Sequence, residues 1–223
     1  MIPKAEAKER LPISEEQKTL IIKTWREHRM GLPALIMLFC GLRRGELLAL
    51  TWDDIDIEGA VISITKSVEF LSNRAVLKKP KTKAGERMVP IPLILLSALQ
   101  SVPHSNTYIC YTETDGSMMT ECAYKRAWNS YQHYLNIQAG GKDASRSHSK
   151  VVAVPPFTAH QLRHTYATML YDAGVDVKSA QLFLGHSDLS ITLKIYTHLS
   201  TIKKNMSIDA LNTYIDGTIK DVR

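Results

Sequence analysis

The sequence predicts a mainly helical α+β fold with a small antiparallel β-sheet at one edge. Most of its apolar residues recur at the spacing of amphipathic helices. Two capping boxes, each a Ser or Thr followed by Gln three residues later, mark helix starts at Ser14 and Thr158. Alternating polar and apolar residues over 54–64 (DIDIEGAVISI) instead predict a hairpin that turns near Glu58 and Gly59.

The N-terminal part is predicted to hold a buried helix that ends at a charged turn. After a first helix over 14–29, Pro33 sits in the first turn of a segment that is apolar all round (ALIMLFC). Gly41 ends that helix, so Arg43 emerges from the interior, and Glu46 follows three residues later to hold it. Spacing alone favours a simple Arg43–Glu46 ion pair that caps a helix.

The middle of the chain is predicted to contain two further strands, over 67–71 and 87–91, with a basic run between them. Such a run is either a solvated loop or a phosphate-contacting surface. Its members cluster around a glycine turn and are Lys78, Lys79, Lys81, Lys83 and Arg87. The segments predicted next are a helix over 92–100, a short strand over 107–111, a helix from Thr120 and a loop over 136–150.

A helix from Thr158 to Gly174 carries two functional candidates in its first turns. His160 and Arg163 are three residues apart, so both project from one side near the positive N-terminal end of the helix. A cationic pair at a helix N-terminus outlines an anion-binding site.

A second helix, capped by Asp176 and closed by Gly185, places His186 directly past its end. Tyr196 comes ten residues after His186, and the pattern predicts that it is weakly packed. Taken singly, each candidate in this region is more typical of a structural residue than of a catalytic one.

The composition predicts a soluble cytoplasmic protein with an acidic polymer as partner. The chain has 223 residues and a formal net charge of +6. Its three cysteines form no CxxC motif, and its N-terminus has no apolar signal core. His160 and His164 have the spacing of a helical zinc pair, but no convincing third ligand accompanies them, and no glycine-rich phosphate loop indicates ATP.

The combination of HQLR, LGHSDLS and the tyrosine of YTH resembles the C-terminal signature of tyrosine recombinases, the phage-type integrase family. The segment LGHSDLSITLKIYTH is most similar to the sequences of the branch of this family found on bacterial mobile elements. GLRRGELLALTWDDID resembles the first arginine motif of the family, and KTKAGERMVPIP resembles its lysine-bearing strand turn. The resemblance spans about 11–199.

The resemblance implies the tyrosine-recombinase catalytic (DNA breaking-rejoining) fold and assigns residues to roles. It implies a strand transferase in which a tyrosine attacks the scissile phosphate, forms a 3′-phosphotyrosyl intermediate and exchanges strands through a Holliday junction. This chemistry integrates or excises a mobile element and needs no metal, ATP or other cofactor. The implied catalytic residues are Arg43, Lys83 (with Lys81 as the alternative), His160, Arg163, His186 and the nucleophile Tyr196. Glu46 supports Arg43, and Lys78, Lys79, Lys81 and Arg87 are the DNA-contacting candidates.

The resemblance also implies a bacterial, nucleoid-associated location, partners and a domain organisation. The partners are double-stranded DNA attachment sites, four protomers assembled on that DNA from free monomers, and accessory DNA-bending factors, with no membrane. We expect one catalytic domain over 11–200 and a C-terminal helix or tail over 201–223 that docks in trans. On that expectation, deleting 201–217 abolishes synapsis and spares single-site cleavage. The core-binding and arm-binding domains of the family are not expected in this chain.

Two other functions share much of this pattern. A type IB topoisomerase-like enzyme uses the same chemistry, but acts as a monomer on any supercoiled plasmid, whereas a recombinase needs paired sites. A catalytically silent DNA-binding module would show replacement of a catalytic residue, and all six positions are filled.

Overall fold

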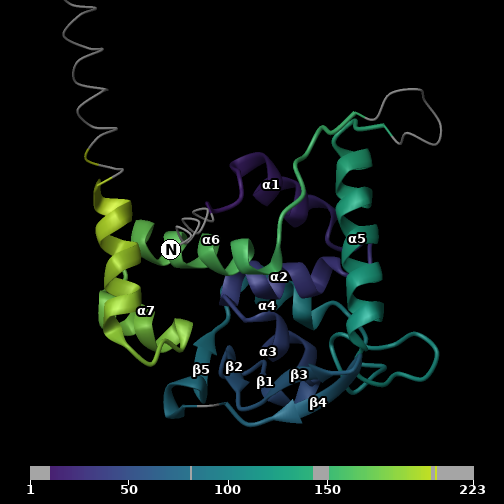
Figure 1. The fold of residues 1–223 in the computed structure, drawn as a ribbon, viewed down its shortest axis with the longest axis horizontal. Coiled ribbons are helices and arrows are strands. Elements are labelled where there is room, and N and C mark those ends of the chain that lie inside the picture. Colours follow the sequence, from purple (N-terminus) through teal and green to yellow (C-terminus); the bar gives the residue numbers. More distant parts are fainter. Residues whose placement is uncertain (1–10, 81, 143–150, 202–203, 205–223) are drawn as a thin grey trace, which may run out of the picture.

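The computed structural model describes residues 11–80, 82–142, 151–201 and 204, and its helices form a body with a thin β-layer along one side (Figure 1). This arrangement confirms the mainly helical α+β prediction. The helices are α1 (Glu15–Thr24), α2 (Gly31–Cys40), α3 (Arg44–Ala49), α4 (Leu93–Gln100), α5 (Glu121–Gln138), α6 (Ala159–Asp172), α7 (Val177–Leu184) and a helix over 189–201.

Helix α2 is the centre of the core. It is apolar all round and packs against α6 along its length and against α1 and α4 (Figure 1). Residues such as Leu35, Ile36 and Met37 are almost fully buried, as predicted from their sequence. Helix α1 begins with the predicted Ser14 capping box but ends at Thr24, earlier than predicted, because the chain turns there to enter α2.

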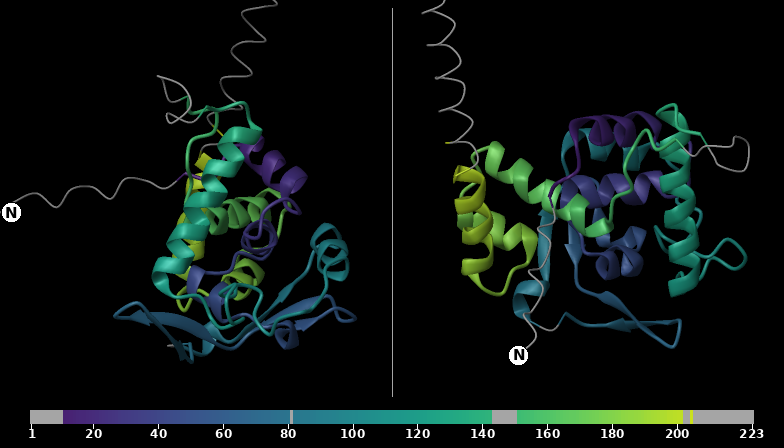
Figure 2. Two further views of the ribbon diagram at one scale, coloured as in Figure 1. Left: turned by 90° about the vertical axis from the view of Figure 1, so that its right-hand side faces the viewer. Right: turned by 45° about the horizontal axis from the view of Figure 1, so that its top comes forward.

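The β-layer consists of a three-stranded sheet and a separate hairpin that extends from the body (Figure 2). The sheet has the antiparallel order β1-β2-β5, and the predicted hairpin over 54–64 is confirmed because Ile55 pairs with Ile62. The strands are β1 (Ile55–Asp56), β2 (Val61–Ile64), β3 (Ser67–Leu71), β4 (Arg74–Lys78) and β5 (Arg87–Pro90), and short 3₁₀ turns lie at Trp52–Asp54 and Lys83–Gly85.

The sequence analysis missed β4 and wrongly placed a strand over 107–111. Strand β4 forms because Ser72 and Asn73 both adopt positive φ, at 48° and 66°. This turn geometry reverses the chain so that β4 pairs antiparallel with β3. The 107–111 segment makes only isolated bridges, from Tyr108 to Thr51 and from Tyr111 to Met118. It has no continuous partner strand, so no ladder develops.

The chain between α5 and α6 is fastened at its base by Asn136. The side-chain amide of Asn136 donates to the carbonyl of Val151 at 3.1 Å, and its oxygen accepts from the backbone N–H of Ala153 at 2.8 Å. The loop predicted over 136–150 starts later than predicted, because α5 continues to Gln138. Residues 143–150 lie outside the described residues, as does the tail predicted over 201–223 apart from residues 201 and 204. Across the described ranges, none of the helices combines the length and apolar character that crossing a membrane requires.

The turn that follows α2 depends on glycine. Gly41 adopts φ +63°, and a Cβ built on it would lie 2.2 Å from the ring of Tyr166 on α6. The backbone of this turn therefore touches the central helix pair directly, and it delivers Arg43 to the edge of the core.

We predict that Gly41→Ala destabilises the protein more than Gly174→Ala does. Gly174 also has a positive φ, at +73°, but a Cβ there meets nothing within 4 Å. Gly174→Ala should cost about 1–2 kcal/mol for the backbone conformation alone, and Gly41→Ala at least about 1 kcal/mol more because the Tyr166 ring must move. Urea unfolding of both variants measures this difference, and equal costs would show that the Gly41 contact is not tight.

Candidate active site

The carboxylate of Glu46 lies between two arginines and is the only anionic side chain with bonds to either of them among the described residues. It accepts from Arg43 Nη1 at 2.7 Å and from Arg87 Nη1 and Nη2 at 3.0 and 2.9 Å. It also accepts from the backbone N–H of Arg43 at 2.8 Å, which caps α3. Glu46 is buried, and burial by itself would raise its pKa, but Arg87 and Arg43 hold the pKa at about 2. The predicted pairing of Glu46 with Arg43 is confirmed.

Arg87 was predicted to contact DNA from the surface, but its side chain lies in the interior. Its side chain is 4 % exposed, pairs with Glu46 through both terminal nitrogens and donates from Nε to the carbonyl of Phe183 at 2.8 Å. A guanidinium with these bonds cannot also reach a DNA backbone from this position. The prediction that Arg87 contacts DNA therefore does not fit the structure; the residue instead joins β5 to α3 and α7.

Three successive carbonyls at the end of α7 each accept from a different arginine. Phe183 O accepts from Arg87, Leu184 O from Arg163 and Gly185 O from Arg43, the last at 3.0 Å. The last carbonyls of a helix lack intrahelical partners and carry partial negative charge, so they suit cations. This turn thus brings together arginines from the α2–α3 turn, β5 and α6.

Arg163 is the buried member of this group. It is 5 % exposed and also donates from Nη1 to the carbonyl of Gly41 at 2.6 Å. Burial, with the nearby charges of Arg43 and Arg87, lowers its pKa to about 9, which still leaves it a cation at neutral pH. Guanidinium has five N–H donors, so two bonds to carbonyls leave others for a ligand.

His186 is held by the turn on which it stands. The Gln181 amide donates to its carbonyl at 3.1 Å, and its backbone N–H donates to Gln181 O at 3.2 Å. Its Nδ1 lies 2.9 Å from Thr192 Oγ1. Burial, followed by Arg163 and Arg43, lowers the pKa of His186 to about 4, so the ring is neutral at physiological pH.

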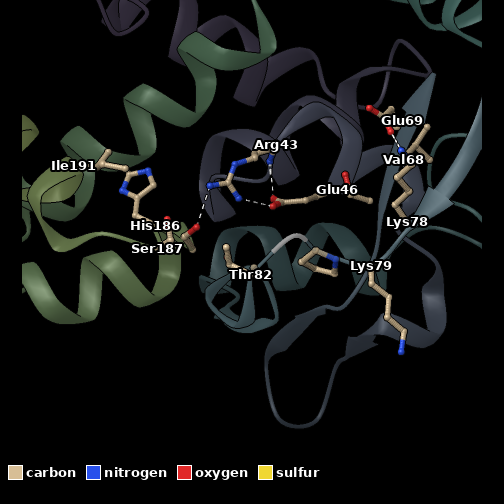
Figure 3. Close-up of a pocket in the computed structure, with 14 residues that line it drawn as sticks. Arg43, Glu46, Val68, Glu69, Lys78, Lys79, Thr82, His186, Ser187 and Ile191 are labelled. Carbon is tan, nitrogen blue, oxygen red and sulfur yellow. Dashed lines mark hydrogen bonds and ion pairs between the residues drawn. The ribbon is translucent and has the colours of Figure 1, made fainter. Parts of the chain in front are cut away.

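Arg43 and His186 face a common pocket of about 430 Å³ (Figure 3). Thr82, Lys78 and Lys79 also line it, but the Lys78 ammonium pairs with Glu69, and that of Lys79 points away from Arg43 (Figure 3). Two segments far apart in sequence, α3 and the α7 turn, thus supply the groups at its centre.

Lys83 and His160 are not among the residues that line this pocket. Lys83 is exposed in the 3₁₀ turn before β5, and Lys81 lies outside the described residues. His160 is exposed and lines a separate recess of about 390 Å³ with Arg44 and Trp128. It still acts on the same region electrostatically, because its charge contributes to the low pKa of His186.

Tyr196 is turned away from the arginines, and the prediction that it is weakly packed is wrong. It is 8 % exposed, its hydroxyl donates to the carbonyl of Val175 at 3.0 Å, and its ring meets that of Tyr171 edge to face at 5.1 Å. Burial, with a contribution from Asp176, raises its pKa. The apolar stripe of helix 189–201 and the end of α6 together enclose it.

The sequence analysis gave Arg87 a surface role and did not consider Thr192, although each residue had a signal of its position. Arg87 lies two residues before Val89 and so shares a face of β5 with it, and Val89 is fully buried, so the strand pattern places Arg87 inward. Thr192 precedes Tyr196 by four residues and Leu199 by seven, which puts a polar group on the buried stripe of its helix.

The fold is that of a phage-type integrase catalytic domain. The model of the phage integrase family matches residues 11–202, and the chain belongs to that family. A XerC-like tyrosine recombinase of Caldanaerobacter subterraneus is 31 % identical over 89 % of this chain, and the ICEBs1 integrase of Bacillus subtilis is 28 % identical over 79 % of it. The chain spans 53 % and 47 % of those proteins, about half of each.

Solved structures support the same fold. The Tn1549 transposon integrase, in a complex with transposon right end DNA, superposes with a TM-score of 0.67 at 23 % identity, covering 92 % of this chain and 67 % of the integrase. XerA recombinase gives a TM-score of 0.60 at 24 % identity and covers 94 % of this chain and 66 % of its own. The predicted catalytic fold is confirmed.

We predict that Glu46→Gln lowers the free energy of unfolding by about 3 kcal/mol at neutral pH, because two guanidinium groups lose their buried counter-charge. Since the folded-state pKa of Glu46 is below its ordinary value, this contribution is complete above pH 4.5 and is lost as the pH falls toward 2. Urea unfolding between pH 7 and pH 3 should show the gap between wild type and variant closing.

The matched control is Glu15→Gln, which breaks the exposed pair of Glu15 with Lys18. It should change stability by no more than about 0.5 kcal/mol. A Glu46→Gln effect as small as that of the control, or one independent of pH, would contradict the buried-cluster account.

Proposed function

We propose that this chain catalyses DNA strand transfer in the site-specific recombination of a mobile element. The observation that carries the proposal is the convergence of Arg43, Arg163 and His186 on one turn, with Arg43 and His186 facing a pocket. Three arginines meet at that turn, and the one carboxylate there, Glu46, pairs with two of them, so the site has an excess of positive charge that suits a phosphodiester. Relatives named as integrases and a solved integrase bound to transposon DNA support DNA as the substrate.

In the proposed reaction the arginines and His186 stabilise charge on the scissile phosphate. Arg43 and Arg163 donate to its non-bridging oxygens, and Glu46 keeps Arg43 in place. His186 donates a further hydrogen bond from the pocket wall. His160 acts from the neighbouring recess once DNA spans both.

Tyr196 is the proposed nucleophile. Its hydroxyl must first leave the Val175 carbonyl, so cleavage includes a movement of helix 189–201 toward the arginines. The Tyr196 oxygen then bonds to phosphorus as the bond to the 5′ oxygen breaks, and the 3′-phosphotyrosyl ester conserves the energy of the broken bond. A strand's 5′ hydroxyl reverses the step through a Holliday junction. Because the ester conserves this energy, the proposed reaction draws on no ATP, and because the arginines and histidines stabilise the phosphate charge, it draws on no metal ion.

Lys83 is the proposed donor of the proton to the departing 5′ oxygen, with Lys81 as the alternative. Lys83 lies on the turn between the pocket-lining Thr82 and β5, so a modest shift of this turn brings its ammonium to the pocket. Lys78 and Lys79 extend the basic surface on the same side for contacts to the DNA backbone.

The proposed substrate is a pair of attachment sites bound by four protomers that are monomers when free, with DNA-bending factors as accessories. The relatives and solved structures are named as integrases and recombinases, and they favour neither a topoisomerase-like activity nor a silent DNA-binding module. Relaxation of plasmid that lacks an attachment site would favour the former, and DNA binding without any covalent product would favour the latter.

We predict that this chain forms a covalent adduct with a nicked suicide duplex carrying its attachment site, and that Tyr196→Phe forms none. The assay is a denaturing gel in buffer with EDTA and without ATP. Tyr171→Phe is the matched control, because Tyr171 packs on Tyr196 but carries no proposed role, and its adduct should persist. An adduct that survives in Tyr196→Phe would place the nucleophile elsewhere.

We predict that Lys83→Ala slows cleavage of the natural phosphodiester by about 100-fold or more, but leaves cleavage of a 5′-bridging phosphorothiolate near the wild-type rate. A thiolate leaves without protonation because a thiol has a pKa of about 8.5. Single-turnover rates on both substrates test this, with Lys81→Ala in parallel. Rescue by sulfur in Lys81→Ala instead would assign the proton to Lys81, and slow cleavage of both substrates by both variants would contradict the role of either lysine.

A further inference from the structure

Thr192 is a fully buried polar residue that faces the active site. It lies on the apolar stripe of helix 189–201 and has no exposed surface. Its hydroxyl makes one hydrogen bond among the described residues, to Nδ1 of His186 at 2.9 Å. Thr165 and Thr168 on α6 show the usual alternative for a helical threonine, a bond to the carbonyl four residues earlier. Thr192 makes no such bond.

The position of the hydroxyl proton determines the state of the histidine. A buried hydroxyl proton without an acceptor costs about 1–3 kcal/mol, and the one acceptor within reach of Thr192 is Nδ1 of His186. A ring nitrogen can accept only when it carries no proton, so the proton of the neutral ring must be on Nε2. Donation in the opposite direction, from Nδ1 to Thr192, would leave the threonine proton unpaired.

We infer that Thr192 is a positioning residue that fixes His186 in the Nε2–H tautomer, so that His186 serves the reaction as a hydrogen-bond donor and not as a proton acceptor. This inference rests on the proposed function for its chemical meaning. His186 lines the pocket, and with Nδ1 taken by Thr192 the nitrogen available to a bound phosphate is Nε2. The ring then has a proton to give and no free lone pair, so the tyrosine proton goes to His160 or to water.

The surroundings of His186 are consistent with a neutral donor. The groups whose charges act on it are Arg163 and His160 from α6, Arg43 from the α2–α3 turn and Arg87 from β5. All are cationic or neutral, so protonating the ring to a cation is unfavourable there before DNA binds. These charges do not determine which ring nitrogen carries the proton. The hydrogen bond with Thr192 does.

The test uses the whole 223-residue chain and needs no DNA. In ¹⁵N-labelled protein at neutral pH, long-range ¹H–¹⁵N spectra report which imidazole nitrogen carries the proton, and His186→Gln identifies the His186 signals by their loss. We expect a protonated Nε2 and a bare Nδ1 in the wild type. Thr192→Val, which keeps the shape and removes the hydroxyl, should populate the other tautomer, and Thr192→Ser should restore the wild-type pattern.

A wild-type His186 with its proton on Nδ1 would overturn the inference, as would a tautomer unchanged in Thr192→Val. Suicide-duplex cleavage gives a second readout, in which Thr192→Val should be about five- to tenfold slower and Thr192→Ser should recover most of the rate. Because the wild-type tautomer is read directly, the result stands even where Thr192→Val fails to fold. A wild type that forms no adduct but shows the expected tautomer would refute the proposed function and leave the role of Thr192 over His186 intact.

Discussion

The structure depends on one buried carboxylate that two guanidinium groups share. Glu46 comes from α3, Arg43 from the turn before it and Arg87 from a strand of the sheet, so a single side chain ties the helical body to the β-layer. Burying the charges of Glu46 and Arg87 without each other would cost several kcal/mol each. Because these side chains must pair with one another, the protein folds only when α3 and β5 lie side by side, and the pocket forms next to this contact.

The same cluster explains how the site is prepared for an anion before any anion arrives. Arg163 and Arg43 are oriented by backbone carbonyls at Gly41, Leu184 and Gly185, all of which are neutral. Neutral carbonyls orient the two guanidinium groups without cancelling their positive charge. One carboxylate among three arginines then leaves a positive field, and in a partly buried pocket such a field acts on a phosphate more strongly than it would in water.

Features set by neighbouring residues were predictable from the sequence, and features set by distant ones were not. The capping boxes at Ser14 and Thr158 formed as expected because each involves residues three apart. Arg87 stands in a run of surface lysines, and only its contacts with Glu46 and Phe183 take it into the interior. Tyr196 has polar neighbours in sequence, Lys194, Thr197 and His198, but Tyr171 on α6 and Val175 just after that helix determine where it packs. The family motifs indicated which residues matter and could not indicate which of them would already be assembled.

The three carbonyls at the end of α7 give this site an unusual kind of tolerance. Arg87, Arg163 and Arg43 are held there by main-chain atoms, which every amino acid supplies equally. Substitution at Phe183 or Leu184 changes the packing around the turn but cannot delete an acceptor. What the turn cannot absorb is a change of length, since adding or removing one residue would shift every carbonyl by one place and mismatch all three arginines together. The length of this segment therefore constrains the site more than the identity of its side chains does.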